Sequence, residues 1–152
     1  MLKYNHIIFL MIFIFFQVPS FANEEKFLSL KKNKVNVRYG PGFDFPIKYI
    51  YKKINLPIKQ IDKKENFRRI IDHKHNSGWI HTSQLKKSSS IILTEKQFIF
   101  TKPTKYSEPI AIAEKGKLVL LNKCKKNWCK TSIGEISGWI FFDKFWGKLP
   151  TN

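Results

Sequence analysis

The tripeptide Gly-Trp-Ile occurs twice in this chain of 152 residues, at residues 78–80 and at residues 138–140. A similar series of short β-type runs precedes each copy, and partner residues in the two series lie 60 to 63 positions apart. Small loop deletions in a duplicated scaffold produce such a gradual change in spacing. Because a repeat of this kind determines the architecture of the whole chain, we predict two small β-modules in tandem rather than one enzyme-sized domain.

Each block contains about five short runs with the composition of β-strands. Residues 35–38 alternate between apolar and polar side chains, which is the period of a half-buried strand. The turn Gly40-Pro41-Gly42 ends this run. Residues 82–85 are expected to form a one-turn helix, and no longer amphipathic helix is predicted. Short strands with frequent turn signals indicate an all-β fold, with a small sandwich or barrel in each block.

An apolar segment near the N-terminus predicts export. Residues 7–16 are continuously apolar, which is too short for the roughly 20 residues that span a bilayer. Ser20-Phe21-Ala22 places small residues at the positions that a signal peptidase requires. We predict a signal peptide at residues 1–22 with cleavage after Ala22, and an uncleaved anchor is the alternative. No transmembrane segment is predicted in the mature chain.

The remainder divides into a first domain at 28–85, a linker at 86–91 and a second domain at 92–147. The sequence Lys86-Lys87-Ser88-Ser89-Ser90 is polar and lacks apolar periodicity, which is typical of a linker. Since it is short, we expect the two domains to lie close together.

The chain is strongly basic, with a formal net charge of +17. Such a charge attracts anionic polymers and anionic surfaces. However, Arg38, Arg68 and Arg69 are the only arginines among 28 basic residues, and a nucleic-acid site would favour arginine for bidentate contacts. The lysines are also spread along the chain. We therefore favour a solvated surface of compositional origin over a nucleic-acid partner.

Cys124 and Cys129 are the two cysteines of the chain. Export would place them in an oxidising compartment, where an even number of cysteines favours a disulfide. The intervening residues are typical of a tight turn, and cysteines that flank such a turn can face each other across a hairpin. A metal site is the alternative, but it needs further ligands, and no histidine lies in the second block, after residue 91.

The segment from Val35 to Gly42 reads Val-Asn-Val-Arg-Tyr-Gly-Pro-Gly. It resembles the signature that opens bacterial SH3 (SH3b) domains, and the aromatic-then-basic strand from Phe67 and the closing Gly78-Trp79-Ile80 resemble later strands of that family. With its second block, the chain is similar to exported two-repeat SH3-like proteins of Gram-negative bacteria. The resemblance implies two tandem small SH3-like barrels of five to six strands, a periplasmic location, and binding or targeting rather than catalysis.

The residues themselves indicate a binding surface in the first block. Tyr39, Phe43 and Phe45 lie on a turn rich in glycine and proline, where aromatic side chains can stack on a peptide or a sugar. Trp79 and His81 share one face of their strand and can border the same groove. Because Trp79 recurs as Trp139, core packing is the favoured interpretation of both tryptophans. Arg38 is expected either to anchor the turn through backbone carbonyls or to contact the ligand.

No catalytic, metal or cofactor site is predicted. His73 and His75 lie in a hydrophilic turn, both cysteines are expected to be paired, and the carboxylates fall in loops without visible pairing. The leading hypothesis is a non-enzymatic periplasmic module that binds a cell-wall peptide or an envelope protein. The alternative is a charge-driven binder of anionic surfaces or nucleic acid. The second block lacks the Gly-Pro-Gly turn, so we expect it to be the stabilising half.

Overall fold

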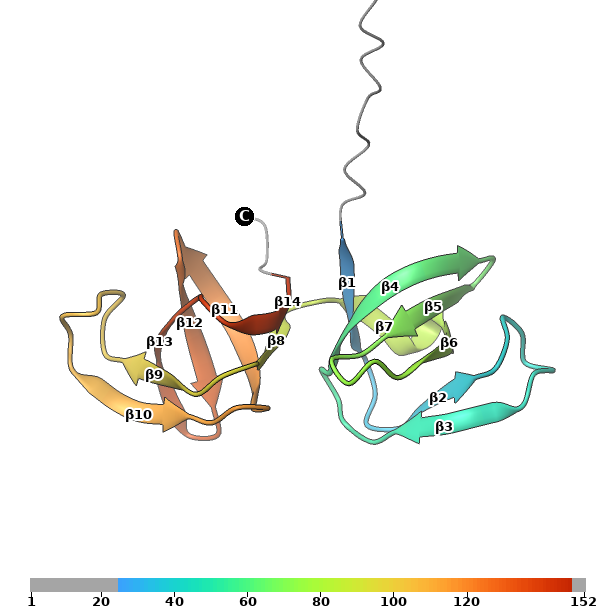
Figure 1. The fold of residues 1–152 in the computed structure, drawn as a ribbon, viewed down its shortest axis with the longest axis horizontal. Helices are drawn as coiled ribbons and strands as arrows, with labels where there is room; N and C mark the ends of the chain where they lie inside the picture. The colour runs from blue at the N-terminus through green and yellow to red at the C-terminus, as the bar shows by residue number, and fades with distance from the viewer. Residues whose placement is uncertain (1–24, 149–152) are drawn as a thin grey trace, which may run out of the picture.

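A computed structural model describes residues 25–148, and within this range two seven-stranded antiparallel sheets lie side by side (Figure 1). The first module contains β1 (Lys26–Leu30), β2 (Val35–Arg38), β3 (Ile47–Tyr51), β4 (Pro57–Lys64), β5 (Phe67–Ile71), β6 (Ser77–His81), the 3-10 helix η1 (Thr82–Gln84) and β7 (Leu85–Lys87). The second contains β8 (Ser90–Leu93), β9 (Gln97–Phe100), β10 (Pro109–Ala113), β11 (Leu118–Lys125), β12 (Trp128–Ile133), β13 (Ile136–Phe141) and β14 (Phe145–Gly147).

The all-β class, the tandem arrangement and the one-turn helix are thereby confirmed. Each module has seven strands, whereas the pattern and the resemblance indicated five or six. The additional strands are three or four residues long, too short to show a period. The predicted signal peptide at 1–22 and its cleavage after Ala22 lie outside the described residues.

The two sheets have the same strand order, which is β3-β2-β6-β5-β4-β1-β7 in the first and β10-β9-β13-β12-β11-β8-β14 in the second. The register repeats as well. Trp79 of β6 lies across from Arg38 on one side and Arg69 on the other. Trp139 of β13 occupies the same position in its own sheet. The two modules can therefore be compared position by position.

Each residue of the repeated Gly-Trp-Ile tripeptide has its own structural role. A Cβ added at Gly78 would lie 3.0 Å from the carbonyl oxygen of Arg38 and would overlap the neighbouring valine of β2. Gly138 is confined in the same way by β9. Ile80 and Ile140 are fully buried. Because side chains alternate along a strand, the tryptophan between each glycine and isoleucine faces away from the core.

Each module has its own apolar core. The first is built around Leu30, Val35, Val37, Leu56, Ile58, Ile70 and Ile80. The second is built around Ile91, Leu93, Ile99, Ala113, Val119, Leu121, Cys129 and Ile140. Trp79 and Trp139 are partly exposed and belong to neither cluster. The favoured interpretation of both tryptophans as core residues is therefore wrong.

The segment 86–91, predicted as a linker, is mostly strand. β7 continues to Lys87 and β8 begins at Ser90, so two residues lie between the strands. Ser88 and Ser90 are buried, and their hydroxyl oxygens lie 3.2 Å and 2.9 Å from that of Ser29. Buried hydroxyls need such partners. The polar composition that resembled a linker is thus a hydrogen-bonded boundary between the modules.

Apolar side chains of the second module also reach the first. Trp146 of β14 donates its Nε1–H to the carbonyl oxygen of Pro57 at 3.3 Å. Its ring packs edge-on against Phe27, with the ring centroids 5.4 Å apart. Ile92 of β8 is buried in the core of the first module. The modules therefore pack against each other and are not two independent domains.

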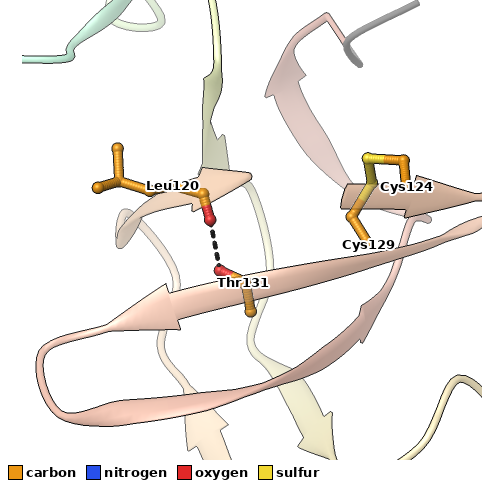
Figure 2. Close-up of a disulfide and its surroundings, with 4 residues drawn as sticks. All are labelled: Leu120, Cys124, Cys129 and Thr131. Carbon is orange, nitrogen blue, oxygen red and sulfur yellow. Dashed lines mark hydrogen bonds between the residues drawn. A yellow bond between two sulfur atoms is a disulfide. The ribbon is translucent and has the colours of Figure 1, made fainter. Parts of the chain in front are cut away.

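The predicted disulfide between Cys124 and Cys129 is confirmed, and it joins β11 to β12 near the turn of their hairpin (Figure 2). Cys129 is fully buried and belongs to the second core. Farther along the hairpin, the buried hydroxyl of Thr131 donates to the carbonyl oxygen of Leu120 at 2.8 Å (Figure 2). The hairpin is thus held by a covalent bond, by core packing and by a satisfied buried hydroxyl.

A buried carboxylate organises the turn between β5 and β6. Asp72 accepts the backbone N–H groups of Lys74 at 2.8 Å and Asn76 at 2.9 Å, and the hydroxyl of Tyr51 at 2.9 Å. Burial raises the pKa of Asp72, but the hydrogen bonds from Asn76, Tyr51 and Lys74 outweigh burial and bring the pKa below its ordinary value. Burial lowers the pKa of the adjacent His73, because desolvation disfavours the imidazolium.

We expect Trp146→Ala to lower the free energy of unfolding by about 3 kcal/mol, because removal of a large aromatic side chain leaves a cavity at the boundary. Loss of this contact should also separate a single calorimetric transition into two. Trp139→Ala removes the same side chain from an outer face and should keep one transition. A single, unshifted transition in Trp146→Ala would contradict the shared boundary.

Replacing both Cys124 and Cys129 with serine should lower the free energy of unfolding by about 2 kcal/mol, as the chain-entropy model gives for a short closed loop. Urea denaturation measures the change. Reduction of the unsubstituted protein is the control and should shift its midpoint to that of the double variant. Equal midpoints with and without reductant would show that the bond does not stabilise the fold.

Stability should fall as the pH is lowered, in two ranges. The pKa of His73 is lowered by folding, so the unfolded chain binds more protons and stability is lost as the pH falls below 6.5. The pKa of Asp72 is also lowered, so its contribution is present above pH 3.8 and is lost as the pH falls through the folded-state pKa. The urea midpoint should depend less on pH below 6.5 in His73→Gln, and less on pH below 3.8 in Asp72→Asn. Unchanged pH profiles in both variants would contradict this assignment.

Candidate binding site

One face of the first sheet carries all the predicted binding residues of the strands. We define the outer face of the first module by Arg38, Phe67, Arg69, Trp79 and His81. Arg38 is paired with Trp79, Trp79 with Arg69, and His81 with Phe67. Directly opposed residues of neighbouring strands point to the same side of a sheet. These five side chains, from β2, β6 and β5, therefore lie on the side of the sheet opposite the core, and Phe67 among them is buried, with 6% of its surface exposed.

Arg38 holds the adjoining loop, residues 39–45, in a defined shape. Its Nη1 donates to the carbonyl oxygen of Phe43 at 3.1 Å and to that of Phe45 at 2.7 Å. The ring of Phe45 lies against Gly40, where an added Cβ would overlap it. Of the two roles expected for Arg38, the structure shows the anchoring of this turn. Ligand contact by Arg38 stays a prediction.

The loop presents aromatic side chains to solvent. Tyr39 is 63% exposed and Phe43 is 65% exposed. The inner edge of Phe43 packs against Phe67 and His81, with ring centroids 5.2 Å and 5.0 Å away. The guanidinium of Arg38 lies 5.4 Å from the centroid of the Phe43 ring, which adds a cation–π contact. An exposed ring is thus held in place before any ligand arrives.

A pocket of about 310 Å³ opens beside the loop. Arg38, Lys48 and Arg69 line it together with Tyr39 and Trp79. The Nζ of Lys48 donates to the carbonyl oxygen of Ser77 at 3.0 Å and lies 5.6 Å from the centroid of the Tyr39 ring. The lining contains no carboxylate. The pocket therefore combines positive charge with two aromatic walls.

The structure brings all six candidate residues to one region, but divides them between two neighbouring features. Arg38, Tyr39 and Trp79 line the pocket. Phe43 and His81 form an aromatic cluster with the buried Phe67, and Phe43 is its exposed member. Phe45 supports the loop backbone through its ring and its carbonyl oxygen.

Sequence reasoning missed Phe67, Arg69 and Lys48. Phe67 and Arg69 are two positions apart in one strand and could have been assigned to one face by alternation. Their placement beside Trp79 requires the register between β5 and β6. Lys48 lies at an irregularity in the pairing of β2 with β3, and no sequence signal places its side chain in the pocket.

The outer face of the second module was missed altogether. At the positions of Arg38, Phe67 and His81 the second module has Phe100, Trp128 and Phe141. The Phe100–Trp128 and Trp128–Phe141 ring centroids are 5.5 Å and 5.2 Å apart. The Nζ of Lys105 lies 4.3 Å from the centroid of the Phe141 ring. The stabilising role expected of this half stays a prediction, and the half also presents a row of aromatic side chains.

The other candidate reactive groups are dispersed. His73 lies in the turn between β5 and β6, and Nδ1 of His81 lies 2.8 Å from the Ser83 hydroxyl at the start of η1. Both cysteines are in the disulfide. Within residues 25–148, no three His, Cys, Asp or Glu side chains are grouped as metal ligands. In that same range no helix has the length and apolar character to cross a membrane.

Both modules are similar to a known domain family. The bacterial SH3 domain family model matches residues 31–87 and 94–147. Similar solved structures include NlpC2 and NlpC1 from Trichomonas vaginalis, with sequence identities of 13% and 12% and TM-scores of 0.37. Each match covers 82% of this chain and 48% or 46% of the other, so the chain spans about half the length of these structures. No curated protein matches the chain.

The two family matches span β2 to β7 and β9 to β14, which is most of both modules. They include the Asn-Val-Arg strand, the turn that Arg38 anchors and both Gly-Trp-Ile strands. The chain therefore belongs to the bacterial SH3 domain family, of which it contains two tandem copies.

Proposed function

We propose that this protein is an exported, non-enzymatic binding protein of the periplasm. Its first module holds an extended peptide of the cell wall, with a peptide segment of an envelope protein as the alternative partner. The apolar segment at residues 7–16 supports export, and family membership supports binding rather than catalysis. No cofactor takes part in this function.

The observation that carries the proposal is the pre-formed loop on the outer face of the first module. Phe43 is 65% exposed, yet its ring is fixed by Phe67 and His81, and its carbonyl oxygen is fixed by Arg38. A rigid aromatic side chain loses little conformational entropy on binding. Small β-domains use such aromatic surfaces to hold extended peptides.

Charge supports a second candidate function. The chain has a formal net charge of +17, and many of its lysines are exposed without an ion pair in the described residues. A binder of anionic surfaces would rest on this charge and would be weakened strongly by salt. A peptide site built on Phe43 would retain most of its affinity because its aromatic contacts are not screened.

Retention on purified peptidoglycan tests the proposal. We expect the protein to be retained at about 0.05 M salt and still at about 0.5 M salt, where surface charges are screened beyond a few ångströms. Phe43→Ala should reduce retention about tenfold, because truncation of an aromatic anchor of an interface costs about 1–2 kcal/mol.

Tyr106→Ala is the matched control, because Tyr106 is a fully exposed aromatic residue in the corresponding loop of the second module. It should leave retention unchanged. Retention that disappears at high salt would favour the charge-driven function. No retention at either salt concentration would exclude the cell wall as partner and leave the envelope-protein alternative.

A further inference from the structure

The arginines of this chain are unevenly distributed. Only three of its 28 basic residues are arginine, and two of these, Arg38 and Arg69, line the 310 Å³ pocket on the outer face of the first module. The third, Arg68, is the neighbour of Arg69 in β5 and points to the opposite side of the sheet. The other basic residues of the chain are lysines, so the planar guanidinium groups, which can donate two hydrogen bonds to one ligand, are concentrated at this pocket.

The strand order arranges the pocket as a row. Lys48 of β3, Arg38 of β2, Trp79 of β6 and Arg69 of β5 come from four neighbouring strands. Adjacent strands are about 4.8 Å apart, and Trp79 lies between Arg38 and Arg69 in this row. Lys48 adds a third positive charge at the edge. Three cationic side chains thus line one pocket, where they can act on a single anion.

The donors of this row are not all engaged within the protein. The Nη1 of Arg38 is occupied by the loop carbonyls. Arg69 is exposed, and its side chain forms no hydrogen bond or ion pair with the described residues. Asp62 lies across from Arg69 in β4, but the carboxylate accepts the N–H of Lys63 and forms no ion pair with Arg69. A guanidinium is thus left available at the pocket wall.

We propose that this pocket binds the free carboxylate of a peptide, held by Arg69 and Lys48 above Trp79, next to the aromatic loop. The proposal rests on the proposed function, because the same peptide would continue across Phe43. A carboxylate matches the planar guanidinium in a bidentate geometry. In the empty pocket the cationic side chains repel one another, and a bound anion reduces this repulsion.

The second module shows that the repeat does not impose this pocket. Phe100 occupies the position of Arg38, and Lys130 occupies that of Arg69. Ile110 lies in the β-irregularity that corresponds to the position of Lys48. With one cation in place of three, the second module has no equivalent carboxylate site. The row of three cations therefore occurs in the first module and not at the equivalent positions of the second.

The arginine side chains offer a direct test by NMR, because three Nε–Hε signals are simple to assign. The probes are N-acetyl-Ala-Ala with a free carboxylate and the same dipeptide with a C-terminal amide. We expect the free acid to shift the signals of Arg69 and Arg38 and to leave Arg68 unaffected. The amide should produce less than about a tenth of the shift, since it lacks the charge that strengthens the hydrogen bonds.

Two matched substitutions distinguish binding in the pocket from attraction by the net positive charge of the protein. Arg69→Gln should weaken binding of the free acid at least about tenfold, because it removes the charge-assisted bidentate contact. Arg68→Gln removes the same charge from the adjacent residue and should leave the affinity unchanged. Both variants should fold, because neither side chain belongs to the core, and thermal unfolding checks this. Equal weakening by the two substitutions would overturn the proposal.

Inorganic phosphate is the competing probe. If phosphate displaces the free acid at a lower concentration than acetate does at the same ionic strength, the pocket is a phosphate site and the carboxylate assignment is wrong.

Failure of the carboxylate pocket can also be distinguished from failure of the proposed function in the peptidoglycan experiment. Retention on peptidoglycan that is unaffected by Arg69→Gln would overturn this pocket and keep the proposed function. Shifts of Arg69 without any retention would keep the pocket and overturn the cell-wall partner.

Discussion

The close approach of β6 to β2, and of β13 to β9, is the contact on which both modules depend. At Gly78 and Gly138 the neighbouring strand leaves no room for a Cβ atom. This approach brings Ile80 into the core on one side and Trp79 to the outer face on the other. The surface proposed for binding is therefore a direct consequence of the same packing that closes the core.

The two modules share this framework but differ in the side chains on their outer faces. Register and strand order are the same in both modules, whereas the outer face carries arginine and histidine in the first and aromatic side chains in the second. The disulfide is another local change, since Cys124 and Cys129 stand where the first module pairs Lys63 with Arg68. Framework residues and surface residues have thus diverged independently.

Contact between the modules limits how far they can act separately. Trp146 bonds to the backbone of β4, and Ile92 is buried in the core of the first module. Three serine hydroxyls satisfy one another at the same boundary. A second module held in this way positions its aromatic row at a constant distance from the loop of the first.

The sequence was sufficient for features that depend on local pattern. Alternation located the strand at 35–38, and the turn residues between Cys124 and Cys129 indicated the hairpin that their disulfide closes. The glycines and aromatic residues of the loop from Tyr39 to Phe45 marked the surface that the structure shows to be exposed. These features are decided within a few residues, so they can be read without the fold.

Other features needed the tertiary structure. The repeat identified Trp79 and Trp139 as equivalent residues. The face of the sheet that they occupy is decided by the position of each core. The polar composition of 86–91 could not reveal its strands, because their pairing partners are distant in sequence.

The sequence alone determined the duplication, the β class and the candidate loop, because periodicity and turn chemistry act locally. Only the tertiary structure placed Arg69 and Lys48 beside Arg38, because their meeting depends on the register between strands that lie far apart along the chain.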